Sequence, residues 1–310
     1  MNKRDTVLSL LSNESAWNYV PAGFFMHFDP AFHRGQAAID KHLEFFRYTG
    51  MDFVKIQFEQ PLPPHPLNKP SDWNNAPLFP DEFFEPAIKV VEGLVKAAKS
   101  EALVIMTLYS PLMWAIHLDE NADIAGHLEE NPDVVKKGLE IMTENVLKLV
   151  KGCKRVGVDG YYASTQGGES FRFRDKTFFS KYIKPTDLAV WDELQSCTFN
   201  ILHVCDYKGG YDDLTPFLDY PGHMVNSSLK LGDKHLTPTE ILQMFKRPFM
   251  GGLERTRTIA TGSAETIRAE VNRVLDQKSD RFILAADCTV PSETPWENLK
   301  IAIDIAHEYQ

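Results

Sequence analysis

Apolar runs long enough to form strands recur along the chain and alternate with segments of helical periodicity. Eight runs predict strands, at residues 20–28, 53–58, 103–108, 156–162, 199–204, 223–227, 248–253 and 282–286. Between them, apolar positions with a period of about 3.6 residues predict helices, at residues 37–48, 83–99, 134–150, 176–195, 239–245, 264–277 and 296–307. The segment after Val204 predicts no defined helix.

Strands that alternate with helices favour a parallel sheet covered by helices. Local signals support two of the helix starts, because Ser263 precedes one segment and Thr237 with Glu240 forms a capping-box pattern before another. Eight strands favour closure into a (β/α)8 TIM barrel, and we predict a single α/β domain over residues 1–310. The structural alternative is a doubly wound open sheet.

Composition narrows the functional classes. The chain has 310 residues, of which 43% are hydrophobic and 25% charged, as in an ordinary globular protein. Its formal charge of −10 and its lack of basic runs argue against a nucleic-acid partner. No apolar run is long enough to span a membrane and the first residues lack a secretory signal, so we expect a cytoplasmic protein without membrane contact.

A proline-rich stretch at residues 61–80 is the longest irregular segment. Long loops in compact domains often serve function. Because this loop follows the second predicted strand, it would lie over the mouth of a barrel, either as a lid or as a static surface loop.

Three residues form a candidate metal site. His203 and Cys205 end the fifth predicted strand and face the same side because side chains alternate along a strand. Cys288 follows the eighth strand, and strand ends from distant parts of a barrel sequence meet at one mouth. Three protein ligands with an open fourth position are typical of catalytic zinc. Spacing alone nevertheless favours buried structural thiols, and we interpret Cys153 and Cys197 as packing residues.

Several stretches resemble the uroporphyrinogen decarboxylase superfamily, and most closely its zinc-dependent branch that methylates thiols from a corrinoid. They are residues 201–205, 251–253, 281–288 and 295–299. The resemblance runs in strand order through nearly the whole chain. It implies that His203, Cys205 and Cys288 bind zinc, that the substrate is a small-molecule thiol, and that methylcobalamin on a partner corrinoid protein is the methyl donor.

The chain also departs from the family pattern. The decarboxylases carry a Met-Arg-Gln-Ala-Gly-Arg run after the first strand, whereas here Met26 is followed by His27-Phe28-Asp29-Pro30-Ala31. The arginines expected to hold a substrate with many carboxylates are therefore missing. Glu59 appears at the position of the decarboxylase catalytic Asp, and Asp206 replaces the Gly that usually follows the Cys of the pair.

The resulting hypothesis is a thiol methyltransferase in which zinc deprotonates the thiol nucleophile. We predict Glu59 as a catalytic residue and His27, Tyr162, Gln166 and Asn226 as substrate-binding residues, since each lies near the end of a predicted strand. The alternatives are a carboxy-lyase that acts on a tetrapyrrole through Glu59, and a non-catalytic barrel that binds a corrinoid or a partner.

Overall fold

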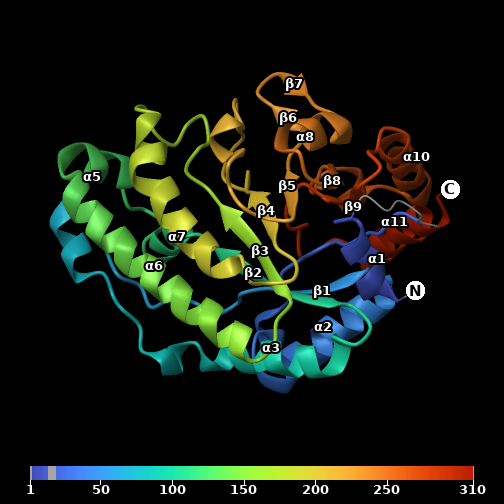
Figure 1. Cartoon of the computed structure of the whole chain (residues 1–310), viewed down its shortest axis with the longest axis horizontal. Helices are drawn as coiled ribbons and strands as arrows, with labels where there is room; N and C mark the ends of the chain where they lie inside the picture. Colours follow the sequence, from blue (N-terminus) through green and yellow to red (C-terminus); the bar gives the residue numbers. More distant parts are fainter. Residues whose placement is uncertain (1, 13–18, 310) are drawn as a thin grey trace.

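The computed structural model describes residues 2–12 and 19–309, and a curled parallel sheet of seven strands forms its centre (Figure 1). The strands follow the order β1-β2-β3-β4-β5-β8-β9, and nearly all of their residues are buried. This burial is typical of a parallel sheet that helices cover, as predicted. Their bounds are β1 (Phe53–Ile56), β2 (Leu103–Tyr109), β3 (Gly160–Thr165), β4 (Ile201–Val204), β5 (Met224–Ser227), β8 (Phe249–Leu253) and β9 (Phe282–Ala286). A short antiparallel hairpin of β6 (Lys230–Leu231) and β7 (Lys234–His235) extends from the loop after β5.

The first predicted strand, residues 20–28, is wrong as a strand. It is extended chain that makes one bridge, between Ala22 and Leu284 of β9. On its other side, the backbone N–H of Ala22 donates to the Asp52 carboxylate at 2.7 Å, where a regular strand would continue backbone pairing with β1. The carbonyl of Ala22 still accepts the N–H of Asp52 at 3.0 Å. The segment thus joins the two edge strands of a TIM-barrel-like fold without becoming an eighth strand.

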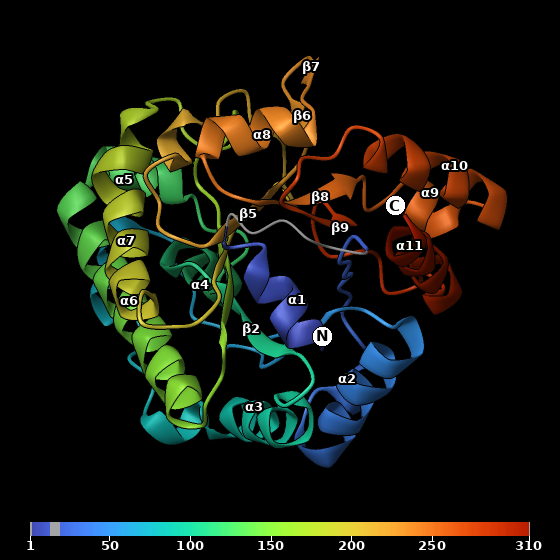
Figure 2. The same ribbon diagram turned by 45° about the vertical axis from the view of Figure 1, so that its right-hand side comes forward.

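Helices surround the sheet, and seven of them correspond to the predicted segments (Figure 2). These are α2 (Gly35–Thr49), α3 (Glu85–Ala98), α6 (Pro132–Arg155), α7 (Lys184–Leu194), α8 (Pro238–Phe245), α10 (Ala264–Leu275) and α11 (Trp296–Glu308). The capping box of Thr237 and Glu240 starts α8 as predicted, and Ser263 caps α10. The described part of the chain has four further helices that were not predicted, namely α1 (Lys3–Ser9), α4 (Pro111–Leu118), α5 (Ile124–Glu130) and α9 (Thr258–Thr261).

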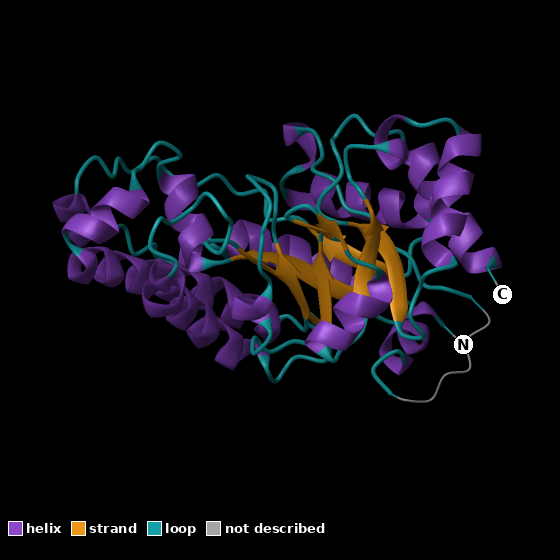
Figure 3. Ribbon diagram, turned by 90° about the horizontal axis from the view of Figure 1, so that it is seen from above, coloured by secondary structure: helices purple, strands orange, loops and turns teal. Residues whose placement is uncertain are grey.

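Helix α1 covers the amino-terminal end of the sheet. The backbone N–H of Arg4 donates to the carbonyl of Glu101, just before β2, and its guanidinium pairs with Asp159, just before β3, at 2.8 Å. Figure 3 shows the sheet enclosed between helices. The carboxyl ends of the strands therefore remain the accessible end of the sheet. Among the described residues, no helix is long and apolar enough to cross a membrane.

The proline-rich loop at residues 61–80 is anchored along much of its length. Trp73, in a short 3-10 helix, is fully buried against α6 and donates to the ring of His127 at 3.2 Å. The side chain of Asn145 on α6 accepts the N–H of Phe79 and donates to the carbonyl of Pro77, both at 2.8 Å. Only the start of the loop, at Pro61 and Leu62, reaches the cavity described below. The static alternative fits this packing better than a free lid.

Candidate metal centre

The carboxyl ends of β4 and β9 bring the three predicted metal ligands together. His203 lies on β4, in register with Ser164 of β3 and Asn226 of β5. The N–H of Cys205 still bonds to the carbonyl of Thr165 at 3.0 Å, so the strand geometry extends far enough for Cys205 and His203 to face one side. Cys288 arrives from the end of β9. The distant positions that the sequence suggested are thus neighbours in space.

The geometry of the three donors suits a metal ion. Their ligand atoms all lie within 4.8 Å of one another, and all three side chains are buried. The two sulfur atoms are 4.0 Å apart, close to the separation of about 3.8 Å that two thiolates have around tetrahedral zinc. Neither ring nitrogen of His203 has a hydrogen-bond partner among the described residues, although both are buried. A buried imidazole without a partner is unusual, and a bound cation would satisfy one nitrogen.

The two thiols are electrostatically unequal. The hydrogen bond from Cys288 is the main cause that lowers the pKa of Cys205, and burial only partly opposes it. The same bond, together with burial, raises the pKa of Cys288 well above its usual value. The pKa of Cys205 is therefore lower than that of Cys288, and Cys288 retains its proton at neutral pH. Binding of a divalent cation would release that proton, because metal ligands bind as thiolates.

A charged clamp joins the two cysteine-bearing segments. Asp206 follows Cys205, Asp287 precedes Cys288, and Arg255 lies between the two carboxylates. The Arg255 guanidinium is 2.7 Å from Asp206 and 3.4 Å from Asp287, and its backbone N–H donates to Asp287 at 3.0 Å. Asp206, which departs from the family pattern at this turn, therefore has a definite partner. The clamp ties the two strand ends that carry the sulfur atoms.

A cavity of about 700 Å³ opens above the three candidate metal ligands. Apolar side chains such as Phe58, Tyr109 and Met113 form one part of its wall, and His27, Glu59 and Lys55 contribute polar groups. Among the described residues that line it, none is an arginine. A volume of this size accepts a small organic molecule.

His27 and Glu59 form a pair in this cavity. The His27 Nδ1 atom lies 2.9 and 3.0 Å from the two carboxylate oxygens of Glu59, and His33 approaches the same carboxylate at 3.8 Å. Burial acts to raise the pKa of Glu59, but the hydrogen bond from His27 and the positive charge that the nearby histidines carry when protonated outweigh it, so the pKa is lowered. Glu59 is therefore ionised at neutral pH and accepts hydrogen bonds there.

The other predicted substrate residues occupy different positions. Gln166 lines the cavity, and its Nε2 atom is 3.5 Å from the Cys205 sulfur. Tyr162 also lines it, stacks on the ring of His203 at 4.6 Å between centroids, and donates to Asn226 at 2.6 Å. Asn226 is fully buried and is not among the lining residues; its amide also donates to two backbone carbonyls. The structure thus places Asn226 beneath Tyr162.

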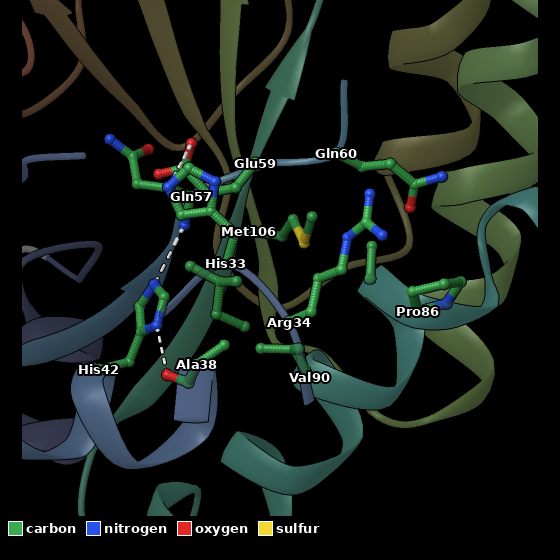
Figure 4. A pocket seen from close by; sticks show the side chains of 12 residues that line it. His33, Arg34, Ala38, His42, Gln57, Glu59, Gln60, Pro86, Val90 and Met106 are labelled. Carbon is green, nitrogen blue, oxygen red and sulfur yellow. Dashed lines mark hydrogen bonds and ion pairs between the residues drawn. The ribbon is translucent and has the colours of Figure 1, made fainter. Parts of the chain in front are cut away.

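Two polar residues near the cavity were not predicted as site residues. Lys55 lies on β1 and lines the cavity, and Gln57 follows β1 directly. The ammonium of Lys55 donates to the Gln57 Oε1 atom at 2.6 Å. Figure 4 shows that His42 connects Gln57 to α2. The backbone N–H of Gln57 donates to the Nε2 atom of His42, and the Nδ1 atom of His42 donates to the carbonyl of Ala38. Burial lowers the pKa of His42 to about 4, so this bridge between α2 and the end of β1 is neutral.

Cys153 and Cys197 lie outside the cavity. Cys153 is buried on α6, where burial raises its pKa to about 12, and Cys197 is partly buried before β4. Both agree with their interpretation as packing residues.

The fold and the site together define an α/β protein whose curled parallel sheet forms a half-barrel, with a donor cluster and a cavity at the carboxyl ends of its strands. The chain belongs to the uroporphyrinogen decarboxylase family, whose model matches residues 47–309. No curated protein matches the sequence.

Solved structures share this fold at low sequence identity. A methyltransferase from Methanosarcina mazei superposes with a TM-score of 0.81 and 15% identity, covering 100% of this chain and 99% of that chain. A B12-independent methionine synthase from Shewanella sp. W3-18-1, in complex with selenomethionine, gives a TM-score of 0.58 and 12% identity, covering 94% of this chain and 97% of that one. These likenesses show the TIM-barrel-like fold.

Proposed function

We propose that this protein is a zinc-dependent methyltransferase that activates a thiol for methyl transfer from a corrinoid. The observation that carries the proposal is the cluster of His203, Cys205 and Cys288, three buried donors that face one cavity. Three protein ligands leave a fourth position open. The set of two thiolates and one imidazole is typical of zinc rather than of magnesium or calcium.

Bound zinc would supply one chemical effect, which is to lower the pKa of a substrate thiol so that it is a thiolate at neutral pH. The thiolate sulfur then attacks the methyl carbon. A bond forms between the thiolate sulfur and the methyl carbon. The bond between the methyl carbon and the methyl donor breaks, and its electron pair stays with the donor. The corrinoid donor and the thiol acceptor both rest on the family resemblance, and the cluster of His203, Cys205 and Cys288 supplies the site at which zinc would bind that thiol.

The residues of this chain have separate tasks in the proposal. Gln166, next to the Cys205 sulfur, restrains that ligand. The proton of the substrate thiol passes to His27, whose side chain is 42% exposed and can return it to solvent. Glu59 stabilises the protonated imidazole as an ionised partner. In this account Glu59 acts through His27 and does not itself donate the proton.

The lining of the cavity favours this proposal over decarboxylation of a tetrapyrrole. A porphyrinogen carries many carboxylates, which arginine binds best through paired hydrogen bonds. No arginine is among the described residues that line the cavity.

The test is methylation of 2-mercaptoethanol by methylcobalamin with the zinc-loaded protein. We expect methylated thiol from the wild type and its loss in Cys205→Ser and Cys288→Ser. Cys197→Ser is the matched control and should remain active, because Cys197 lies outside the cavity.

Two outcomes would contradict the proposal. Equal methylation by the wild type and both serine variants would show that Cys205 and Cys288 are not needed for the reaction. Zinc-independent release of carbon dioxide from uroporphyrinogen would instead establish the carboxy-lyase alternative, and a zinc-loaded protein inactive with both substrates would indicate a binding barrel.

A further inference from the structure

The inside of the sheet contains a buried lysine that neither the family resemblance nor the proposed mechanism uses. Lys55 lies in the middle of β1, between apolar neighbours, and its residue is only 6% exposed. Its side chain lines the same cavity as His203, Cys205 and Cys288. Charged residues are rarely buried in this way without a partner of opposite charge.

The contacts of Lys55 fix the ammonium but do not neutralise it. The Nζ atom lies 4.3 Å from the ring centroid of Phe25 and 4.6 Å from that of Tyr162, so two aromatic faces hold it. Its hydrogen-bond acceptor is the Gln57 side chain, which also accepts from Thr107 at 2.7 Å. Among the described residues, no carboxylate forms an ion pair with Lys55. An ammonium has three donor hydrogens, so further donor capacity remains.

The charge of the proposed metal centre supplies a reason for such a cation. Zinc with two thiolates and a neutral imidazole has no net charge, and a substrate thiolate in the fourth position adds one negative charge. That charge would lie in a buried cavity, where an uncompensated ion is unfavourable. Lys55 is the buried cation that lines this cavity.

We infer that Lys55 is the counter-cation of the substrate thiolate, and that it makes the open metal position selective for anionic ligands over neutral ones. This inference rests on the proposed function. Lys55 would raise the affinity for the thiolate by direct charge attraction, with Gln57 and the two aromatic rings holding the ammonium in place.

The electrostatics of the cavity agree with this role. Burial lowers the pKa of Lys55 to about 7, whereas Cys288, Glu59 and Cys205 act to raise it when they are in their anionic forms. Lys55 and the cysteine sulfurs therefore influence each other across the cavity. An additional anion beside Lys55 would stabilise its charged form in the same direction.

The experiment compares two ligands of different charge on the cobalt-substituted protein. Cobalt(II) takes the place of zinc and reports ligand binding through its visible and near-ultraviolet absorption. 2-Mercaptoethanol, which binds as a thiolate, and imidazole, which binds as a neutral ligand, are titrated into wild type and Lys55→Met. We expect the variant to bind the thiol roughly 10- to 100-fold more weakly, as for loss of a buried charge-assisted contact, and to bind imidazole as the wild type does.

Lys208→Met is the matched control, because Lys208 lies at the edge of the same cavity but is exposed, so water screens its charge. It should change neither titration appreciably. Lys55→Gln, which keeps a hydrogen-bonding group and a similar length, provides the same measurement if Lys55→Met does not fold, and its thiol affinity should fall in the same way.

Three results separate the inference from the proposed function. Thiol binding of wild-type strength by the folded Lys55 variants would overturn the inference and leave the proposed function standing. Equal weakening of thiol and imidazole would also overturn it, since that pattern indicates damage to the cavity rather than loss of charge. A wild-type protein that binds cobalt but no thiol would overturn the proposed function itself, and the inference with it.

Discussion

The clamp formed by Arg255 offers a sharp test of how the proposed metal ligands are positioned. Its side chain is 15% exposed, and the two carboxylates that it contacts, Asp206 and Asp287, are 14% and 10% exposed. Replacement by methionine keeps much of the apolar stem but removes the charge. Two neighbouring carboxylates would then repel each other beside Cys205 and Cys288, which they adjoin in sequence.

The expected effect is weaker zinc binding. Contacts that orient metal ligands from outside typically change metal affinity by roughly 10- to 100-fold. That range corresponds to about 1.4 to 2.8 kcal/mol of binding free energy. We therefore expect Arg255→Met to raise the zinc dissociation constant within this range, as measured at neutral pH by competition with a chromophoric chelator.

Arg257→Met is the control for this prediction. Arg257 is 73% exposed and pairs with Glu254 at 3.6 Å, so its removal should leave zinc affinity unchanged. If Arg255→Met binds zinc as tightly as both the wild type and Arg257→Met, the clamp does not position the ligands and the reasoning is refuted.

Three further predictions concern residues around the site. Glu59→Gln should lower the free energy of unfolding at pH 7, and the difference from wild type should shrink in acid. The folded-state pKa of Glu59 lies below the usual value of about 4.3, so its contribution to stability is present above that value and is lost as the pH falls through the folded pKa. Urea unfolding at pH 7 and in acid measures this, and a constant difference would contradict it. Asn226→Ala should lower the free energy of unfolding by about 3 kcal/mol because its hydrogen bonds are lost, and it should affect thiol binding only through Tyr162. A folded variant of normal stability that no longer binds thiol would show that Asn226 contacts the substrate directly. Trp73→Ala should cost about 3–5 kcal/mol, because Trp73 is fully buried against α6, and a loss below about 1 kcal/mol in urea unfolding would show that the 61–80 loop is not anchored there.

Much of the fold could be predicted because the strands of a parallel sheet are buried on both faces and appear in the sequence as continuous apolar runs. The same property explains the error at residues 20–28, since burial alone does not distinguish a strand from extended chain that bonds to a carboxylate. The strand predicted at residues 156–162 begins later, at Gly160, because α6 continues to Arg155 and Gly157 turns with a φ of +91°. Helix α4 was missed because most of its residues are buried and it has no polar face to reveal a period.

Part of the donor cluster could be predicted from the sequence because side chains alternate along a strand. Alternation along β4 is a local rule, so His203 and Cys205 could be placed on one side without coordinates. The arrival of Cys288 depended on the barrel, and the fold brings it within reach. Arg255 was not predicted, because its partners are 49 and 32 residues away and no local pattern links them. Lys55 lies within an apolar run that predicts a strand, and a single charged residue in such a run does not by itself indicate a site.

The most direct test of the account is the zinc content of the purified protein, measured by elemental analysis after zinc loading and removal of excess metal. We expect one tightly bound zinc ion per chain in the wild type and in Cys197→Ser, and a strong decrease in Cys205→Ser and Cys288→Ser. A wild type that retains no zinc, or serine variants that retain as much as the wild type, would contradict the metal centre on which the proposed function depends.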